Sequence, residues 1–353
     1  MGKIKIAIIG CGNIAKNAHC RNYLQLTDRF ELVAACDIIE ERAKAYAAEF
    51  GIPATYTDYR EVLKIEGLDA VDICTPNYLH SVIAVEALEA GLNVLCEKPD
   101  AINPAEAKKM QDAAEKSGKL LMVIRNNRFI NQTQYLKKYI DAGKLGEVYA
   151  ARCGWQRRRG VPGRGGWFTT KELSGGGPLI DLGVHMIDVA MWLMGSPRPV
   201  SVSGCAYNKF ANASETGGKY AAANASGTFD VEDLAMGFIR FDNGACLQIE
   251  FSWASNVRGD NKFFELRGTE AGAEWSTVDN ELRIYTEECG KTVDLIPQLG
   301  KDLNGHLGNL RNFADAIEGK AEPVFKVQEG VDMIKILCAI YESAQTGKEV
   351  VLD

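Results

Sequence analysis

The chain has 353 residues, of which 46% are apolar and 25% are charged, so it can bury a full core and its length suggests two domains. This composition excludes a largely disordered chain. The net charge of −7 and the isoelectric point near 5.4 argue against a general role on nucleic acids or membrane surfaces, because phosphate contacts need a basic face. A small-molecule substrate fits this balance better.

The ten cysteines are scattered and include no C-x-x-C pair. This pattern favours buried thiols in a reducing compartment over a disulfide framework or a zinc site. The N-terminal apolar segment is too short for a signal-peptide core, and no apolar stretch reaches the length of a membrane span. We therefore expect a cytoplasmic protein with no metal site.

From residue 3 to about 124, short β-branched runs alternate with helix-like segments, which is typical of βαβ units and a parallel sheet. Helix signals lie between the runs: Asp58 with Glu61 forms a capping box, and Asn103 precedes Pro104 at a first helical position. We predict an α/β Rossmann domain over residues 1–124. Its expected strands are Ile4–Ile9, Leu32–Cys36, Ala54–Tyr56, Ala70–Cys74, Asn93–Cys96 and Leu120–Ile124.

After Ile124 the pattern changes to glycine-rich loops and closely spaced alternating segments, which predict antiparallel pairing. Residues 125–353 should therefore form an α+β domain with an open, predominantly antiparallel sheet, and 208–228 should be a long surface loop. A helix over about 331–343 is expected to pack back on the first domain. Strands are expected at Ala235–Phe241, Ala245–Trp253 and Lys262–Arg267.

A glycine turn follows the first strand directly and opens a helix, giving G-x-G-x-x-A. Gly10 makes the tight turn, and Gly12 lets the backbone approach a pyrophosphate, with Asn13 and Ile14 beside it. The amides of the helix N-terminus then face the phosphates. The turn predicts a dinucleotide cofactor.

Asp37 ends the second expected strand, where a carboxylate can hold a ribose 2′-hydroxyl. The alternative is an ordinary turn aspartate. Ile38 and Ile39 follow and offer no cation to a 2′-phosphate, which the carboxylate should repel. NAD is therefore favoured over NADP.

Three further motifs follow in order: Cys74-Thr75-Pro76-Asn77-Tyr78-Leu79-His80, Cys96-Glu97-Lys98-Pro99, and Gly175-Gly176-Gly177 leading to Asp181-x-x-x-His185. With the glycine turn, these motifs resemble those of the glucose-fructose oxidoreductase, inositol dehydrogenase and rhizopine catabolism (Gfo/Idh/MocA) family. The resemblance spans nearly the whole chain.

The resemblance implies a dinucleotide fold followed by an open sheet that often mediates homodimers or homotetramers. It also implies that Glu97 and Lys98 lie beside the nicotinamide. Either Asn126 or Asn127 would face the site, and Asn126 is our candidate. The other residues implied to line the cofactor are Thr75, Pro76, Asn77 and His80.

The apolar segment Leu179–Leu193 carries Asp181, His185 and Asp188 at spacings of four and three, which share one helical face. Buried polar groups need partners, so a wet pocket facing this stripe explains it. The alternative is a satisfied core histidine with an aspartate favoured by the helix dipole. The Glu-Lys-Pro motif favours the functional interpretation.

Oxidation of a secondary alcohol removes a hydride from carbon and a proton from oxygen. Histidine titrates near neutral pH, so His185 can act as the general base. Lys98 can stabilise the developing alkoxide, and Asp181 can accept a hydrogen bond from a neighbouring substrate hydroxyl. The resemblance implies corresponding roles.

The segment from Trp155 to Phe168 places arginines and two tryptophans among glycines. We expect a lid or subunit contact that brings Arg158 and Trp167 to a polyhydroxylated substrate, with a purely structural loop as the equal alternative. The acidic net charge disfavours nucleic acid. His306 has no motif partner, so we expect a structural or peripheral role.

These observations predict an NAD-dependent oxidoreductase that transfers a hydride between a ring hydroxyl carbon of a sugar or cyclitol and the nicotinamide. One alternative is a glycosidase that keeps NAD bound and oxidises the sugar transiently. Another is a catalytically silent NAD-binding regulator. The sequence leaves open the substrate, the carbon oxidised, the physiological direction, the choice between dimer and tetramer, and the role of the arginine-rich loop.

Overall fold

The computed structural model describes residues 2–210, 227–300 and 303–353. It divides into two compact units. Unit 1 comprises Met1–Asn126 and Asn304–Val331, and unit 2 comprises Asn127–Leu303 and Asp332–Asp353. Residues 304–331 thus belong to unit 1 rather than to the second domain that the sequence predicts over residues 125–353.

Unit 1 is built on a six-stranded sheet in the order β3-β2-β1-β4-β5-β6, and every neighbouring pair is parallel. This is the strand order of a dinucleotide-binding Rossmann fold, as predicted. The strands are β1 Ile4–Ile9, β2 Phe30–Cys36, β3 Ala54–Tyr56, β4 Ala70–Ile73, β5 Asn93–Cys96 and β6 Leu121–Val123. Each begins and ends within two residues of the predicted range.

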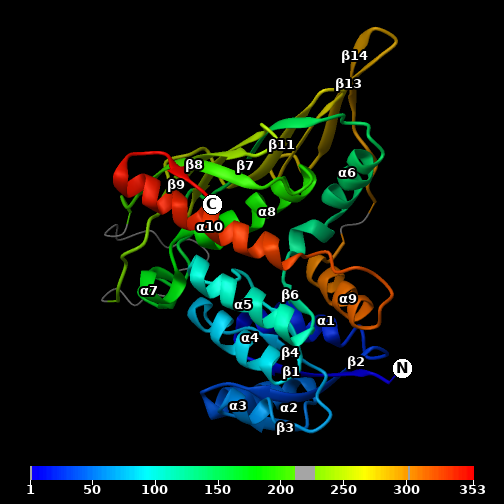
Figure 1. Ribbon diagram of the computed structural model, residues 1–353, viewed down its shortest axis with the longest axis vertical. Coiled ribbons are helices and arrows are strands. Elements are labelled where there is room, and N and C mark those ends of the chain that lie inside the picture. Colours follow the sequence, from blue (N-terminus) through cyan, green and yellow to red (C-terminus); the bar gives the residue numbers. More distant parts are fainter. Residues whose placement is uncertain (1, 211–226, 301–302) are drawn as a thin grey trace. The chain divides into compact units, whose positions relative to one another are not determined.

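Helices surround this sheet (Figure 1). Capping side chains mark where several of these helices begin. The Asn103 side chain accepts from the Glu106 N–H with Pro104 in the first turn, as predicted. Asp58 also acts as a cap, although it accepts from the Arg60 N–H rather than from Glu61. The helical segments are η1 Ala15–Cys20, α1 Arg21–Tyr23, α2 Glu40–Phe50, α3 Tyr59–Val62, η2 Asn77–Leu79, α4 His80–Glu89, α5 Pro104–Ser117 and α9 Gly305–Ile317.

Unit 2 is built on a nine-stranded sheet in the order β14-β13-β12-β11-β7-β10-β9-β8-β15. β7 and β10 pair in parallel and the other pairs are antiparallel, which confirms the predicted class. The β13–β14 hairpin projects from one end of this sheet (Figure 1). The strands are β7 Val148–Gln156, β8 Pro199–Tyr207, β9 Leu234–Phe241, β10 Cys246–Ser252, β11 Asn261–Gly268, β12 Gly272–Ser276, β13 Leu282–Glu288, β14 Lys291–Leu295 and β15 Val350–Val351.

Helix α8, Val184–Leu193, packs against β7 and β11 in unit 2. It continues from a π-helical segment, η5, and such segments are frequent at functional sites. The remaining helical segments are η3 Asn126–Phe129, α6 Asn131–Asp141, η4 Trp167–Thr169, α7 Lys171–Ser174, η5 Leu179–Gly183, α8 Val184–Leu193 and α10 Val327–Thr346.

Helix α10 is longer than the predicted 331–343, and its residues divide between the two units. Most of the expected surface loop at 208–228 lies outside the described residues. No helix in the described part of the chain has the length and hydropathy needed to cross a bilayer. All ten cysteines are free thiols.

Candidate active site

The glycine turn has the geometry of a phosphate-binding loop. Gly10 has a φ of +97°, and a Cβ there would lie 2.6 Å from the Cys74 carbonyl oxygen, so only glycine fits. At Gly12, no atom of the described residues lies within 4 Å of an added Cβ. The space beside Gly12 is thus open for a ligand to approach the backbone, and Asn13 and Ile14 beside it are exposed.

Asp37 follows β2 and is held by backbone donors. Its carboxylate accepts from the Cys11 N–H at 3.0 Å and from the Ile39 N–H at 2.9 Å. The Arg42 guanidinium, from α2, lies 3.3 Å from the same carboxylate. This cation lies one turn beyond Ile38 and Ile39, so the residues directly after Asp37 do not reveal it.

The loop after β4 carries an unsatisfied polar atom. The Thr75 Oγ1 is buried and has no hydrogen-bond partner among the described residues, which fits a donor or acceptor on a bound cofactor. The His80 ring nitrogens lie 2.8 Å from the Thr75 carbonyl and 2.7 Å from the Pro99 carbonyl. His80 therefore ties this loop to the one after β5. Pro76 precedes η2, and Asn77 begins it as a buried residue.

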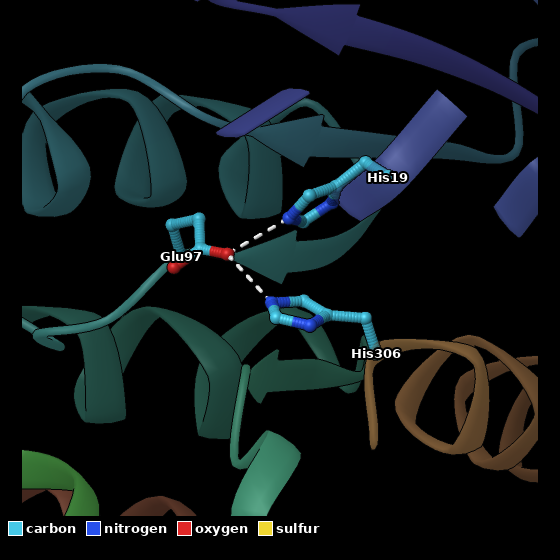
Figure 2. Close-up of side chains that lie close together, drawn as sticks. All are labelled: His19, Glu97 and His306. Atoms are coloured by element: carbon cyan, nitrogen blue, oxygen red, sulfur yellow. Dashed lines mark hydrogen bonds and ion pairs between the residues drawn. The ribbon is translucent and has the colours of Figure 1, made fainter. Parts of the chain in front are cut away.

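A buried polar network connects η1 with the ends of β4 and β5 (Figure 2). The His19 Nδ1 lies 2.7 Å from the Asp72 carboxylate, and its Nε2 lies 2.8 Å from Glu97 Oε1. The Tyr23 hydroxyl donates to Asp72 at 2.8 Å, and His306 Nε2 lies 3.7 Å from Glu97 Oε1. His306 is thus part of this network rather than peripheral.

Opposite charges in this network stabilise the ionised forms of their neighbours. Burial lowers the pKa of His19, but its interactions with Asp72 and Cys74 together outweigh burial and hold the pKa well above its usual value. Burial raises the pKa of Glu97, but hydrogen bonds from His19 and His306 hold it well below its usual value. The second Glu97 oxygen accepts from the Lys98 N–H at 3.1 Å. Glu97 therefore links the network directly to the backbone of Lys98.

His19, Glu97 and His306 also offer metal-ligand atoms within 4.8 Å of one another. Two ligands of one tetrahedral zinc ion, each about 2.0–2.1 Å from the metal, lie roughly 3.3 Å apart. The 2.8 Å between His19 Nε2 and Glu97 Oε1 is instead a hydrogen-bond distance. The geometry favours a shared proton at this position.

The predicted polar stripe in unit 2 divides into two parts. Asp188 is fully buried and receives two hydrogen bonds from Arg128, at 2.9 and 2.7 Å, so it belongs to an internal ion pair. Asp181 and His185 are partly exposed. Asp181 accepts from the buried Trp253 indole N–H at 3.0 Å, which fixes the carboxylate orientation.

Glu232 anchors the start of this segment, and no local pattern in the sequence predicts this role. Its carboxylate accepts from the Gly177 N–H at 2.9 Å and from the Leu179 N–H at 3.0 Å. A Cβ on Gly177 would lie 2.1 Å from the Glu232 carbonyl oxygen, so the glycine permits this close approach. The glycine run thus positions η5 and, with it, Asp181.

The arginine- and tryptophan-containing segment differs from the predicted loop. Trp155 lies in β7, and its ring centroid is 5.8 Å from that of His185. Trp167 stacks on Phe168 at 3.9 Å, and Arg158 is exposed, with its backbone N–H bonded to a carboxylate. Trp155 is therefore a tryptophan whose ring neighbours His185, and the substrate contact expected of Trp167 stays a prediction.

Two matches to family models cover most of the chain. The model described as "Oxidoreductase family, NAD-binding Rossmann fold" matches residues 4–125, and the model for the family's C-terminal alpha/beta domain matches residues 137–352. The chain belongs to the Gfo/Idh/MocA family. The resemblance carried by the four motifs is thereby confirmed.

Relatives with sugar dehydrogenase names match most or nearly all of the chain. D-glucoside 3-dehydrogenase of Escherichia coli K12 is 37% identical over 99% of this chain and 97% of its own. Levoglucosan dehydrogenase of Pseudarthrobacter phenanthrenivorans is 31% identical over 76% of this chain and 73% of its own. The structure of a levoglucosan dehydrogenase with NADH and L-sorbose superimposes with a TM-score of 0.88, at 25% identity, with complete coverage of both chains.

These relatives agree on the chemistry. This Gfo/Idh/MocA protein is an NAD-dependent oxidoreductase that acts on CH–OH groups. Gly12, Asp37 and Thr75 fit the cofactor, because they provide the open backbone, the carboxylate and the unpaired hydroxyl that a dinucleotide engages.

Proposed function

We propose that this enzyme oxidises the C3 hydroxyl of D-glucosides with NAD as the hydride acceptor. The observation that carries the proposal is the 37% identity, over 99% of the chain, to a D-glucoside 3-dehydrogenase. The other relatives support sugars in general as the substrate class. The Lys98, Asp181 and His185 positions supply the groups that such an oxidation needs.

In the proposed mechanism the bound nicotinamide supplies the hydride acceptor. His185 takes the proton from the reacting hydroxyl as a general base. Lys98 stabilises the negative charge that develops on the oxygen. Asp181 accepts a hydrogen bond from a neighbouring hydroxyl.

The local surroundings of these residues support the assignments. Both oxygens of the Glu97 carboxylate contact groups in unit 1: one contacts His19, and the other accepts from the Lys98 N–H. These contacts hold the backbone at Lys98 in place. The Trp253 N–H fixes Asp181, and Trp155 packs beside His185. Such support keeps catalytic side chains in a productive geometry before the substrate binds.

A screen of purified protein against glucosides, free sugars, cyclitols and sugar acids, read as NADH absorbance, tests this function. We expect NADH with D-glucosides and a 3-keto product. Hydrolysis of a glucoside without net NADH would instead identify an NAD-retaining glycosidase. Tight NAD binding with no turnover of any compound would identify a regulatory protein.

We further propose a cytoplasmic homodimer or homotetramer that assembles through the sheet of unit 2. Exposed aromatic side chains on three of its strands, Tyr149, Tyr207 and Tyr285, support an interface there. The ten free cysteines support a reducing compartment. Light scattering after size exclusion tests the assembly, and a monomeric mass would overturn it.

A further inference from the structure

Lys262 lies in β11, directly opposite Trp155 of β7 in the antiparallel register. Its Nζ donates a 2.6 Å hydrogen bond to the Asn127 side-chain oxygen. The same Nζ lies 5.0 Å from the Trp155 ring centroid and 5.4 Å from that of Trp275. The ammonium group is therefore enclosed by two aromatic rings and one amide.

Among the described residues, no carboxylate forms an ion pair with Lys262. Burial lowers the pKa of Lys262 to about 8. An unpaired, largely buried ammonium is costly to the fold, and such groups concentrate at functional sites. Lys262 is nevertheless not a fully buried residue, because part of its surface stays exposed.

Trp155 connects Lys262 to the candidate catalytic histidine. The Trp155 ring contacts the Lys262 ammonium. Its centroid lies 5.8 Å from that of the His185 ring and 5.1 Å from the Arg157 guanidinium. One aromatic side chain thus lies beside both Lys262 and His185.

We propose that Lys262 is a substrate-binding residue that donates hydrogen bonds to a hydroxyl or ring oxygen of the sugar held at His185. An ammonium group has three donors, and Asn127 takes one of them. A polyhydroxylated ligand supplies acceptors for the others. This inference rests on the proposed function, because it requires a sugar at His185.

Steady-state kinetics of Lys262→Met with methyl glucoside and NAD test the proposal. Methionine keeps much of the side-chain length but removes every donor. We expect KM for the glucoside to rise about 10- to 100-fold, the range for one hydrogen bond from a charged donor, while the Kd for NAD stays within about twofold. Lys291→Met, at an exposed position on β14 of the same sheet, is the matched control and should leave KM unchanged.

Stability separates a binding role from a structural one. Because the buried ammonium lacks a counter-ion, Lys262→Met should keep or raise the melting temperature. In the wild type, KM should also rise as pH climbs through about 8, where the ammonium loses its charge, and this rise should be absent in Lys262→Met. A structural lysine predicts a lower melting temperature and the same pH profile in both proteins.

Reductive methylation of the wild-type enzyme gives a test that needs no variant. With NADH bound, methyl glucoside should protect Lys262, and not Lys291, from modification measured by peptide mass spectrometry. Equal labelling of Lys262 with and without the glucoside, or an unchanged KM in a folded Lys262→Met, would overturn the subsite. If the wild type instead oxidises no sugar at all, the proposed function itself fails.

Discussion

His19 Nε2 lies 2.8 Å from Glu97 Oε1, and both side chains are almost completely buried. This contact joins the segment after the glycine turn to the Glu-Lys-Pro motif at the end of β5. Because Glu97 also accepts from the Lys98 N–H, the histidine positions the backbone of the candidate catalytic lysine. His19 is therefore a positioning residue in this account.

Removal of the His19 imidazole should destabilise the fold strongly. His19→Ala leaves the Asp72 and Glu97 carboxylates buried without their shared cation, which should cost about 3–5 kcal/mol of unfolding free energy. Urea denaturation measures this. His19→Ala with Glu97→Gln removes one of the two charges and should recover part of the loss, whereas additive losses in the double variant would refute the coupling.

The same pair makes stability depend on pH in a defined direction. The folded pKa of His19 lies above its unfolded value of about 6.5, so its contribution is complete below that pH and is lost as pH rises through the folded value. Glu97 has a lowered folded pKa, so its contribution is present above about 4.5 and is lost as pH falls through the folded value. The difference in unfolding free energy between wild type and His19→Gln should therefore be largest between about pH 4.5 and 6.5. A difference that stays constant from pH 6 to 10 would contradict this.

Cofactor choice should depend on Asp37 and Arg42 together. The wild type should bind NAD more tightly than NADP, because the Asp37 carboxylate repels a 2′-phosphate. Asp37→Ala should erode this preference about tenfold or more, since it releases Arg42 to attract that phosphate. Calorimetric titrations of both cofactors measure the effect. Arg42→Ala added to Asp37→Ala should weaken NADP binding again, and an unchanged NADP affinity would refute the role of Arg42.

The unpaired Thr75 hydroxyl gives a separate test of the cofactor site. Thr75→Val keeps the shape, so the melting temperature without cofactor should hold or rise, while the Kd for NAD should increase about 2- to 10-fold. Thr133 is the matched control, because its buried hydroxyl already donates to the Asn127 carbonyl at 2.8 Å. Thr133→Val should lower stability. If Thr75→Val lowers the melting temperature and leaves the Kd unchanged, Thr75 has no part in binding NAD.

Much of the fold could be predicted because its signals are local. The β-branched run Ile4–Ile9 and the cap at Asn103 each act over a few residues, and both lie where the pattern placed them. The four motifs likewise predict the family, the cofactor class and the enzyme class from the sequence alone.

Contacts between distant residues could not be predicted in this way. His19 and Asp72 are separated by 53 positions, and the parallel sheet order brings them together. An aspartate inside the fully buried strand Ala70–Ile73 was the one available signal of a buried partner. The glycines and arginines that follow Trp155 predict a loop there, yet strand pairing extends β7 through it.

Transfer of the C3 hydrogen tests the central claim most directly. Methyl glucoside deuterated at C3 is incubated with the enzyme and NAD, and the mass of the nicotinamide product is measured over time. We predict deuterated NADH from the wild type and a rate at least about 100-fold lower from His185→Ala, the scale expected for loss of a general base. Unlabelled NADH from this substrate, or near-full activity in His185→Ala, would contradict the account.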